Sequence, residues 1–254
     1  MTDAFGRIAL CARANWRMKA ALSARLTLFF CVPYFTLQRL TLFPARTLPL
    51  SAIDRAIDFD PRWVWVYQSV YLLLAIVPWM VTTRAELRQY ARGFLLLSGV
   101  GFAFFLLLPV RGPRPDIESA NLMFRILQWY DGPLNCLPSL HVGLAAYTVL
   151  FGARLLRDRT TVSGRLAVVS LAWLWATLIA YAALATKQHY AIDLPAGALL
   201  ACVCHWWNCH NMQRSTAHGE RPTVRPHLSP GPVGVLLSER DGYAATNGNV
   251  HTRR

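Results

Sequence analysis

Charged residues are scarce in this sequence of 254 residues. Only 15% are Asp, Glu, Lys or Arg, whereas 54% are hydrophobic. This balance is typical of a membrane protein. Among the charged residues the acidic ones are the minority, because 13 Asp and Glu stand against 26 Lys and Arg, which gives a formal net charge of +13.

Other features are missing too, and each absence excludes a class of protein. The first 25 residues have no compact apolar core followed by a small-residue cleavage site, so we expect no cleaved signal peptide. There is no internal repeat and no second globular domain. The positive charge follows the loops between apolar runs and forms no basic face, so we expect no nucleic-acid binding.

The cysteines are few and unevenly placed. Of six, only Cys136 is expected outside the cell, so we predict no disulfide framework. Residues 202–210, "CVCHWWNCH", contain ligand types that suit zinc, but the spacing matches none of the usual patterns. Positions 202, 205 and 209 would share a helical face, so a metal site there stays open beside the reading of reduced cysteines near a membrane helix.

Six apolar runs approach the 20 or so helical residues that cross about 30 Å of hydrocarbon. They are residues 26–43, 63–81, 93–110, 137–156, 166–185 and 190–207. The sequence therefore predicts an all-α polytopic membrane protein, with a bundle of six transmembrane helices over residues 26–207. Residues 1–25 would precede it, and residues 208–254, rich in Pro, Gly, Ser and Arg, would form a disordered tail.

The distribution of positive charge predicts the orientation, because cytoplasmic loops retain Lys and Arg. With the N-terminus inside, 18 of the 26 Lys and Arg fall in cytoplasmic segments and 8 fall outside. We therefore expect both termini to be cytoplasmic, in a bacterial inner membrane or another cell membrane. Polar residues of the loop at 109–116 and of the starts of the fourth and sixth runs would then meet at the extracytoplasmic end.

Asp193 lies near the start of the sixth run, in "TKQHYAIDLPAG". A carboxylate in hydrocarbon costs at least about 2.5 kcal/mol without a partner. His189 precedes it by four residues, which is one turn of a helix. A carboxylate bound to one imidazole nitrogen leaves the other nitrogen free to attack. His189 is thus the candidate nucleophile and Asp193 its orienting partner.

The fourth run opens with "NCLPSLHVGLAAY". Pro138 suits the first turn of a helix, and the Ser139 hydroxyl would lie beside backbone N–H groups that favour an anion. His141, one turn further on, could donate a proton to a departing oxygen. Phosphate would also attract nearby cations, namely Arg111, Arg114 and Lys187. These residues predict phosphoryl transfer without a metal or another cofactor, since Asp116, Glu118 and Asp131 are too dispersed for magnesium.

"PSLH" at 138–141 and "KQHYAIDLPAG" at 187–197 resemble the second and third signatures of the type 2 phosphatidic acid phosphatase superfamily, and "PRP" at 113–115 is similar to the end of the first. The closest resemblance is to the branch that includes inositol phosphorylceramide synthases, and it covers about residues 90–205. It implies a six-helix membrane enzyme with an extracytoplasmic site. His189 would form a phosphohistidine, Asp193 would orient it, His141 would protonate the leaving group, and Ser139 and Arg114 would bind phosphate.

Two positions depart from that family pattern. Leu107 stands where the first signature has a lysine, and Ala183 stands where the third has an arginine. Lys187 and Arg111 are the candidates to replace these cations, although lysine binds as a point charge where arginine grips two oxygens. Lys187 two residues before the histidine is also a feature of the branch named above.

Several functions remain open. Water attacking the phosphohistidine would make a lipid phosphatase, which we favour because water is always present, and an alcohol would make a headgroup phosphotransferase. The expected partners are a lipid phosphate substrate and membrane lipids, with no protein partner indicated. A haem protein with His141 and His189 as axial ligands, and a membrane scaffold without catalysis, are the alternatives of other classes.

Overall fold

The structure is a computed structural model that describes residues 11, 13–114, 119–157 and 159–219. Helices form most of this part of the chain, as the sequence predicts. In chain order the elements are α2 (Trp16–Leu37), β1 (Arg46–Thr47), α3 (Ala52–Ala56), the 3₁₀ helix η1 (Pro61–Trp63), α4 (Val64–Gln68), α5 (Val70–Met80), α6 (Arg84–Leu107), β2 (Val110–Arg111), α7 (Leu122–Tyr130), α8 (Leu140–Leu155), α9 (Val162–Ala185) and α10 (Asp193–Gly219).

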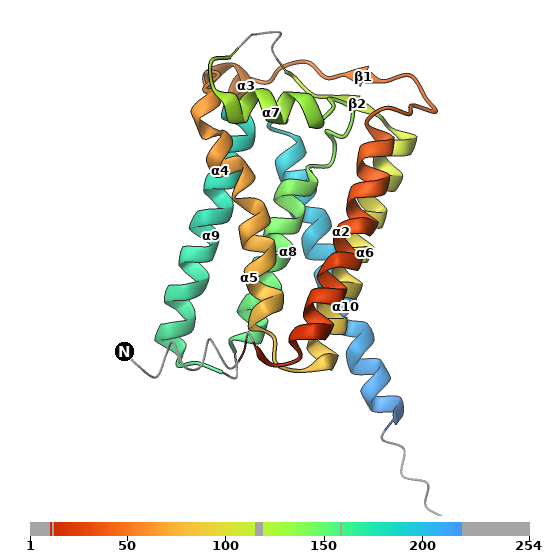
Figure 1. Ribbon diagram of the computed structural model, residues 1–254, viewed down its shortest axis with the longest axis vertical. Helices are drawn as coiled ribbons and strands as arrows, with labels where there is room; N and C mark the ends of the chain where they lie inside the picture. The colour runs from red at the N-terminus through yellow and green to blue at the C-terminus, as the bar shows by residue number, and fades with distance from the viewer. Residues whose placement is uncertain (1–10, 12, 115–118, 158, 220–254) are drawn as a thin grey trace, which may run out of the picture.

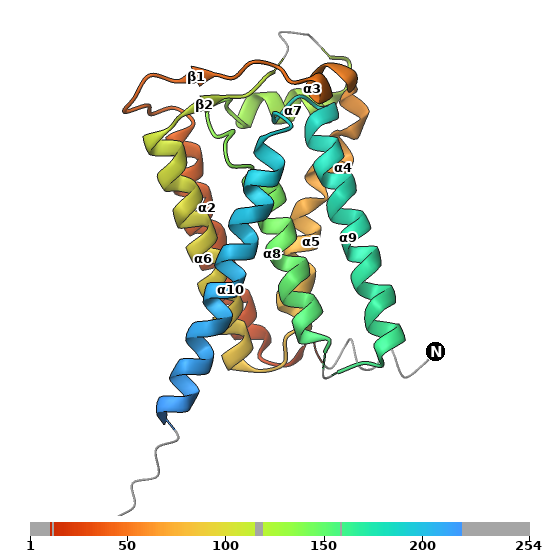
Figure 2. The same ribbon diagram turned by 180° about the vertical axis from the view of Figure 1, so that it is seen from behind.

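The long helices α2, α5, α6, α8, α9 and α10 run side by side along one axis (Figures 1 and 2). Each predicted apolar run overlaps one of them, and the second run is divided between α4 and α5. Within the described residues, four helical stretches are long and apolar enough to cross a membrane: Trp16–Leu37, Pro61–Met80, Arg84–Leu107 and Val162–Ala185. The structure is therefore a helical bundle with four candidate spans, and a topology of six spans remains a prediction.

The outer face of α9 is strongly apolar. Leu166, Leu171 and Leu174 are exposed over 58%, 67% and 56% of their surfaces. A contiguous face of this kind is unfavourable in water but suits lipid chains. The exposure of α9 agrees with its place among the four candidate spans.

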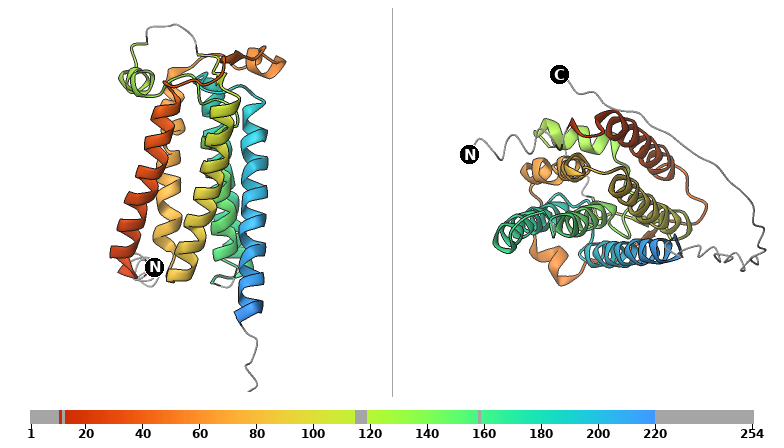
Figure 3. Two further views of the ribbon diagram at one scale, coloured as in Figure 1. Left: turned by 90° about the vertical axis from the view of Figure 1, so that its right-hand side faces the viewer. Right: turned by 90° about the horizontal axis from the view of Figure 1, so that it is seen from below.

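Helix α8 is enclosed by protein. It packs against α5, α6, α9 and α10 (Figure 3), and residues 140–149 are all buried. Glycines bring its neighbours close, because a Cβ at Gly93 would overlap the Tyr147 ring of α8 and a Cβ at Gly197 of α10 would lie 2.2 Å from the Ser139 carbonyl oxygen. Gly197 therefore allows α10 to pack closely against the start of α8.

One end of the bundle is covered by short elements. Helices α3 and α7 and the strands β1 and β2 lie together there (Figure 1). The two strands are parallel, and Arg46 pairs with Val110 and Thr47 with Arg111. The loop before α8 and the loop between α9 and α10 reach the same end, which places the predicted site residues beneath this cover.

At the opposite end of the bundle, the α8–α9 loop contacts the start of α6. Arg159 forms an ion pair of 2.6 Å with Glu86, and Thr83 and Glu86 form a capping box for α6. The start of α2 and the end of α10 lie at this end as well. Helix α10 continues through Gly219, so residues 208–219 of the predicted tail are helical, whereas residues 220–254 lie outside the described chain.

Candidate active site

His189 and Asp193 are neighbours, but they do not share a helix. α10 begins at Asp193, and His189 belongs to the loop that precedes it. The Asp193 carboxylate accepts a hydrogen bond of 2.8 Å from the backbone N–H of Tyr190, which folds the loop back on the helix start. This turn brings His189 Nδ1 to 3.4 Å from Asp193 Oδ2. The predicted pairing is therefore present, whereas the predicted helical geometry is wrong.

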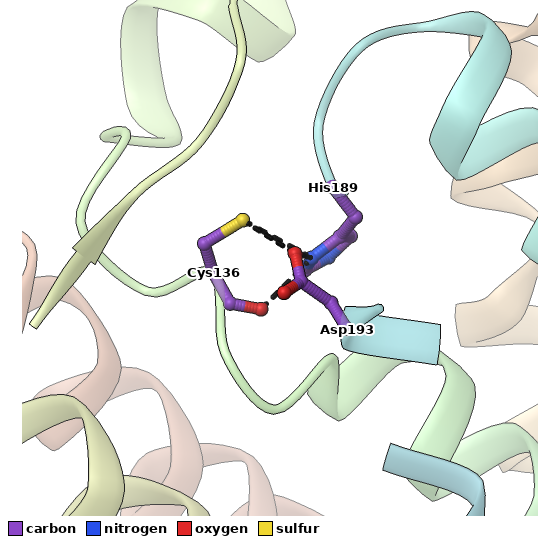
Figure 4. A group of neighbouring side chains, drawn as sticks. All are labelled: Cys136, His189 and Asp193. Carbon is purple, nitrogen blue, oxygen red and sulfur yellow. Dashed lines mark hydrogen bonds and ion pairs between the residues drawn. The ribbon is translucent and has the colours of Figure 1, made fainter. Parts of the chain in front are cut away.

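The backbone carbonyl of Cys136 is the nearest partner of His189. It lies 3.0 Å from Nδ1, closer than the Asp193 carboxylate (Figure 4). Carbonyl and carboxylate oxygens can only accept, so Nδ1 carries the proton in the neutral imidazole. Nε2 is then left with a free lone pair, which is the state that a nucleophilic histidine needs.

Cys136 also holds Asp193 directly. Its thiol donates a hydrogen bond of 2.7 Å to Asp193 Oδ2. Burial raises the pKa of the Cys136 thiol, and the Asp193 charge raises it further, so the sulfur keeps its proton and remains a donor. Cys136, His189 and Asp193 are 2%, 4% and 0% exposed, so this group is closed to bulk water.

These three side chains also have the chemistry of metal ligands. Thiolate, imidazole and carboxylate are all donors to zinc, and the ligand atoms lie within 4.8 Å of one another. Among the described residues this is the group of three that could hold an ion. The sequence cluster at 202–210 contributes one neighbouring pair, His205 and Cys209, at 3.6 Å, while Cys202 is exposed.

His141 lies beside His189 at the start of α8. The centres of the two rings are 6.1 Å apart. The Tyr67 ring stacks on His141 at 4.3 Å, and its hydroxyl lies 3.1 Å from His141 Nδ1. Tyr67 comes from α4, so α4, α8 and the loop before α10 together fix both imidazoles.

Ser139 is the N-cap of α8 and not a residue within it. Its hydroxyl accepts a hydrogen bond of 3.3 Å from Val142 N–H, and its own N–H donates to the Asp193 carbonyl at 3.1 Å. Pro138 therefore lies before the helix, because capping by Ser139 starts α8 at Leu140. The hydroxyl proton stays available to a ligand, beside the free N–H groups of the first turn.

Arg114 is held by Asp131. Its guanidinium donates to the Asp131 carboxylate at 2.9 Å and also to the Asp131 carbonyl. The same carboxylate accepts from Tyr34 at 2.8 Å and from Gln38 at 2.6 Å, and it is 3% exposed. Arg114 Nε is buried with no partner among the described residues. The guanidinium is thus fixed by Asp131, and its Nε–H is among the donors that this contact leaves unused.

Lys187 and Arg111 are not brought to the imidazoles. The Lys187 ammonium binds the backbone carbonyls of Asp54, at 2.8 Å, and of Ile57. These carbonyls lie at the end of α3, where helical partners run out. Arg111 is exposed on β2. The expectation that these two cations replace the missing ones has no support in their contacts.

Ala183 and Leu107, the two positions that depart from the family pattern, lie in apolar or exposed surroundings. Ala183 is fully buried among apolar residues of α4 and α7, including Tyr67 and Phe124, and its carbonyl accepts the N–H groups of Gln188 and His189. Leu107 is 57% exposed at the end of α6. An alanine at 183 therefore serves to pack and cap the His189 loop.

Asp54 supports the candidate site, and no sequence pattern indicates this role. Its carboxylate accepts a hydrogen bond of 2.7 Å from Ala191 N–H, while its carbonyl accepts from Lys187. Burial opposes ionisation, but hydrogen bonds from Ser51 and Ala191, aided by the charge of Lys187, lower the pKa of Asp54 overall. Helix α3 thereby binds the chain on both sides of His189.

The sequence matches the family model of the PAP2 superfamily over residues 51–207. No curated protein matches it. Among solved structures, the crystal structure of Aquifex aeolicus LpxE is similar at a TM-score of 0.41 and 14% sequence identity, covering 74% of this chain and 93% of that one.

Proposed function

The chain belongs to the PAP2 superfamily, and we propose that it is a membrane phosphatase that cleaves phosphate from a lipid phosphate through a phosphohistidine on His189. The observation that carries the proposal is the fixed state of that imidazole. Nδ1 faces the Cys136 carbonyl at 3.0 Å and the Asp193 carboxylate at 3.4 Å, so the lone pair is on Nε2. The positive charge that His189 gains on attack would be stabilised by Asp193.

In the first step, Nε2 of His189 bonds to phosphorus as the bond from phosphorus to the lipid oxygen breaks. His141 gives its proton to that departing oxygen. The two ring centres are 6.1 Å apart, so both imidazoles can act on one phosphoryl group. Tyr67, stacked on His141 and 3.1 Å from its Nδ1, would keep this general acid in place.

The phosphoryl oxygens would be bound by neutral and charged donors together. Ser139 offers its hydroxyl, the first turn of α8 offers free N–H groups, and Arg114 offers the N–H groups that Asp131 does not bind. This set contains one cation in place of the several expected from the family pattern. We therefore assign more of the phosphate binding to the start of α8.

The second step decides the class of enzyme. Water, deprotonated by His141, attacks phosphorus and the bond to Nε2 breaks, releasing inorganic phosphate and restoring both histidines. The alternative is an alcohol as acceptor, which would make the protein a headgroup phosphotransferase of the kind found in the inositol phosphorylceramide synthase branch. Both reactions use the same histidines, and we favour water because it needs no additional pocket.

An apolar cavity supports a lipid as the substrate. It has a volume of about 280 Å³ and lies between α2, α5, α6 and α8, with His141 on its wall. The rest of its lining is largely aliphatic and aromatic, including Leu26, Leu74, Phe94 and Leu144. A hydrocarbon chain held there would bring its attached phosphate to the imidazoles, as the burial of apolar surface favours.

The orientation proposed from charge fits this arrangement. Arg159 and the first turn of α6 lie at the end of the bundle away from the site, where Arg159 pairs with Glu86. If that end faces the cytoplasm, as the positive-inside rule requires, the histidines face the extracytoplasmic side.

The test is phosphate release from a panel of lipid phosphates by the detergent-purified protein, with His189→Ala and His141→Ala beside it. We expect release by the wild type, at least a 10³-fold loss in His189→Ala, and a loss of about 10²–10⁴-fold in His141→Ala. A phosphoryl adduct should be trapped on His189 by rapid acid-free quenching with radiolabelled substrate. Turnover that survives His189→Ala would overturn the mechanism.

Acceptor specificity is tested separately. Diacyl phospholipids or lipid phosphates are supplied with alcohols, and both free phosphate and transferred headgroup are measured. Transfer that exceeds hydrolysis would replace the phosphatase by the phosphotransferase. Absence of either reaction, together with a Soret band in the absorbance spectrum, would favour the haem protein instead.

The role of the cavity is tested by filling it. Leu144→Trp should block long-chain substrates while leaving cleavage of a short, soluble phosphate ester largely intact. Leu171→Trp, on the exposed face of α9, is the matched control and should change neither rate. Equal loss on both substrates in Leu144→Trp would mean that the cavity does not hold the lipid chain.

A further inference from the structure

We propose that Cys136, His189 and Asp193 form a zinc site whose occupation switches the nucleophile off. The three residues come from the loop before α8 and from the loop and first residue at the start of α10 (Figure 4). The inhibition depends on the role proposed for His189, whereas the binding of the ion depends only on the geometry.

The distances among the three ligand atoms fit tetrahedral zinc on two sides. Bonds of about 2.0–2.3 Å from zinc to nitrogen, oxygen and sulfur place tetrahedral ligands roughly 3.4–3.6 Å apart. Here Sγ of Cys136 lies 3.7 Å from Nδ1 of His189, and that Nδ1 lies 3.4 Å from Oδ2 of Asp193. The third side, 2.7 Å from Sγ to Oδ2, is closed by the thiol proton and would open when the proton leaves.

An unsatisfied oxygen points to a missing ligand. Asp193 is 0% exposed, and its Oδ1 has no hydrogen-bond partner within the part of the chain that the structure describes. A buried carboxylate oxygen without a donor is costly. A cation bound between Cys136 and His189 would supply the missing charge, and rotation of the carboxylate would bring Oδ1 to it.

The exchange of protons explains why the ion would inhibit. Zinc takes the place of the thiol proton, which is released to solvent, and it takes the lone pair of Nδ1. The proton of Nδ1 moves to Nε2, so the imidazole stays neutral but its nucleophilic nitrogen is blocked. A divalent ion with one thiolate and one carboxylate leaves no net charge in this buried space, which favours its retention.

The described part of the chain offers a matched comparison. His205 Nε2 and Cys209 Sγ lie 3.6 Å apart on α10, and Arg154 donates to that sulfur at 2.6 Å. A cation beside the sulfur would be repelled by the guanidinium, and these two ligands lack a carboxylate. Cys209→Ser is therefore the control variant, since it removes a thiol next to a histidine without touching the site.

The first experiment measures binding without turnover. Protein stripped with a chelator is titrated with Co²⁺, which reports thiolate ligation by a charge-transfer band in the near ultraviolet. We expect the band in wild type and Cys209→Ser, and its loss in Cys136→Ser. Because the ligands are buried, the band should develop slowly. A band that disappears in Cys209→Ser and persists in Cys136→Ser would overturn the assignment.

The second experiment measures inhibition. After preincubation with Zn²⁺, each variant is compared with its own rate without metal, so that any change in basal activity cancels. We expect wild type and Cys209→Ser to be inhibited and then restored by chelator, and Cys136→Ser to require at least tenfold more Zn²⁺. Equal inhibition of all three would place the inhibitory ion elsewhere.

Two controls keep the outcomes separable. Thermal melting of Cys136→Ser and Cys136→Ala identifies a folding defect, and the variant that stays folded is used. If no lipid is turned over by any form of the protein, the Co²⁺ band still tests the metal site, so failure of the proposed function and failure of this site give different results.

Discussion

The backbone of Gly197 lies against the carbonyl of Ser139, where an added Cβ would approach the oxygen to 2.2 Å. This contact lets the Ser139 N–H reach the Asp193 carbonyl at 3.1 Å. The starts of α8 and α10 are thus joined main chain to main chain. His141 follows one start and His189 precedes the other, so the distance between the imidazoles depends on this contact.

Gly197→Ala should therefore damage both stability and activity. The new methyl meets backbone that has no flexible end to move, so the two helices must separate. We expect a lower melting temperature and a loss of phosphate release greater than the loss of folded protein. Gly99→Ala is the control, because a Cβ there meets nothing within 4 Å and alanine favours a helix interior by about 1 kcal/mol. Equal behaviour of the two variants would count against the contact.

Arg114→Lys should weaken phosphate binding. Lysine cannot reproduce the pair of bonds to the carboxylate and carbonyl of Asp131, so the charge would lose its fixed position. A hydrogen bond to a charged group contributes about 1.5–3 kcal/mol, so we expect KM to rise about 10- to 100-fold. Arg125→Lys, on the exposed side of α7, should leave KM unchanged.

Lys187→Met should reduce stability and leave chemistry in the remaining folded protein largely intact. Its ammonium binds the carbonyls of Asp54 and Ile57, so the change removes donors from the end of α3. We expect a loss of about 1.5–3 kcal/mol in the free energy of unfolding, from one charged hydrogen bond or its equivalent. Arg111→Met, at an exposed position, is the comparison. A large loss of kcat with an unchanged melting temperature would instead indicate that Lys187 binds phosphate.

Cys136 should resist alkylation at neutral pH. Burial and the Asp193 charge raise the pKa of its thiol, so the reactive thiolate is absent until the solution is well above the ordinary thiol range. In the unfolded chain the same thiol ionises near about pH 8.5. Its contribution to stability is therefore complete below that pH and declines as the pH rises. Iodoacetamide labelling from pH 7 to 9, read residue by residue by mass spectrometry, should modify the exposed Cys202 first.

The sequence was sufficient to identify a helical bundle and to pair His189 with Asp193, for physical reasons. Apolar runs near 20 residues mark helices whatever their neighbours, and each run overlaps a helix in the structure. An aspartate four residues after a histidine was correctly paired, although a turn and not a helix brings them together. Both a helical turn and the turn before α10 can bring residues four apart into contact, so the spacing alone does not distinguish the two geometries.

The supporting residues could not be found in the same way. Asp54 binds Ala191 across 137 positions of sequence, and Asp131 binds Tyr34 across 97. Such contacts depend on how the helices pack, which no local pattern encodes. Cys136 had one available signal, its place three residues before Ser139 in a segment already selected. Disulfide and zinc patterns do not indicate a buried thiol that acts as a hydrogen-bond donor, which is the role of Cys136 here.

Helix α3 holds the His189 loop from both sides, through Lys187 before the histidine and Ala191 after it. If His189 is the nucleophile, as proposed, it cannot follow its substrate, and every lipid that reacts must deliver its phosphorus to the same point in space. Preference among lipids would then depend on how their chains lie between α2 and α5. Substitutions in α2 and α5 should alter which lipid is cleaved, while substitutions in the His189 loop should alter only the overall rate of cleavage.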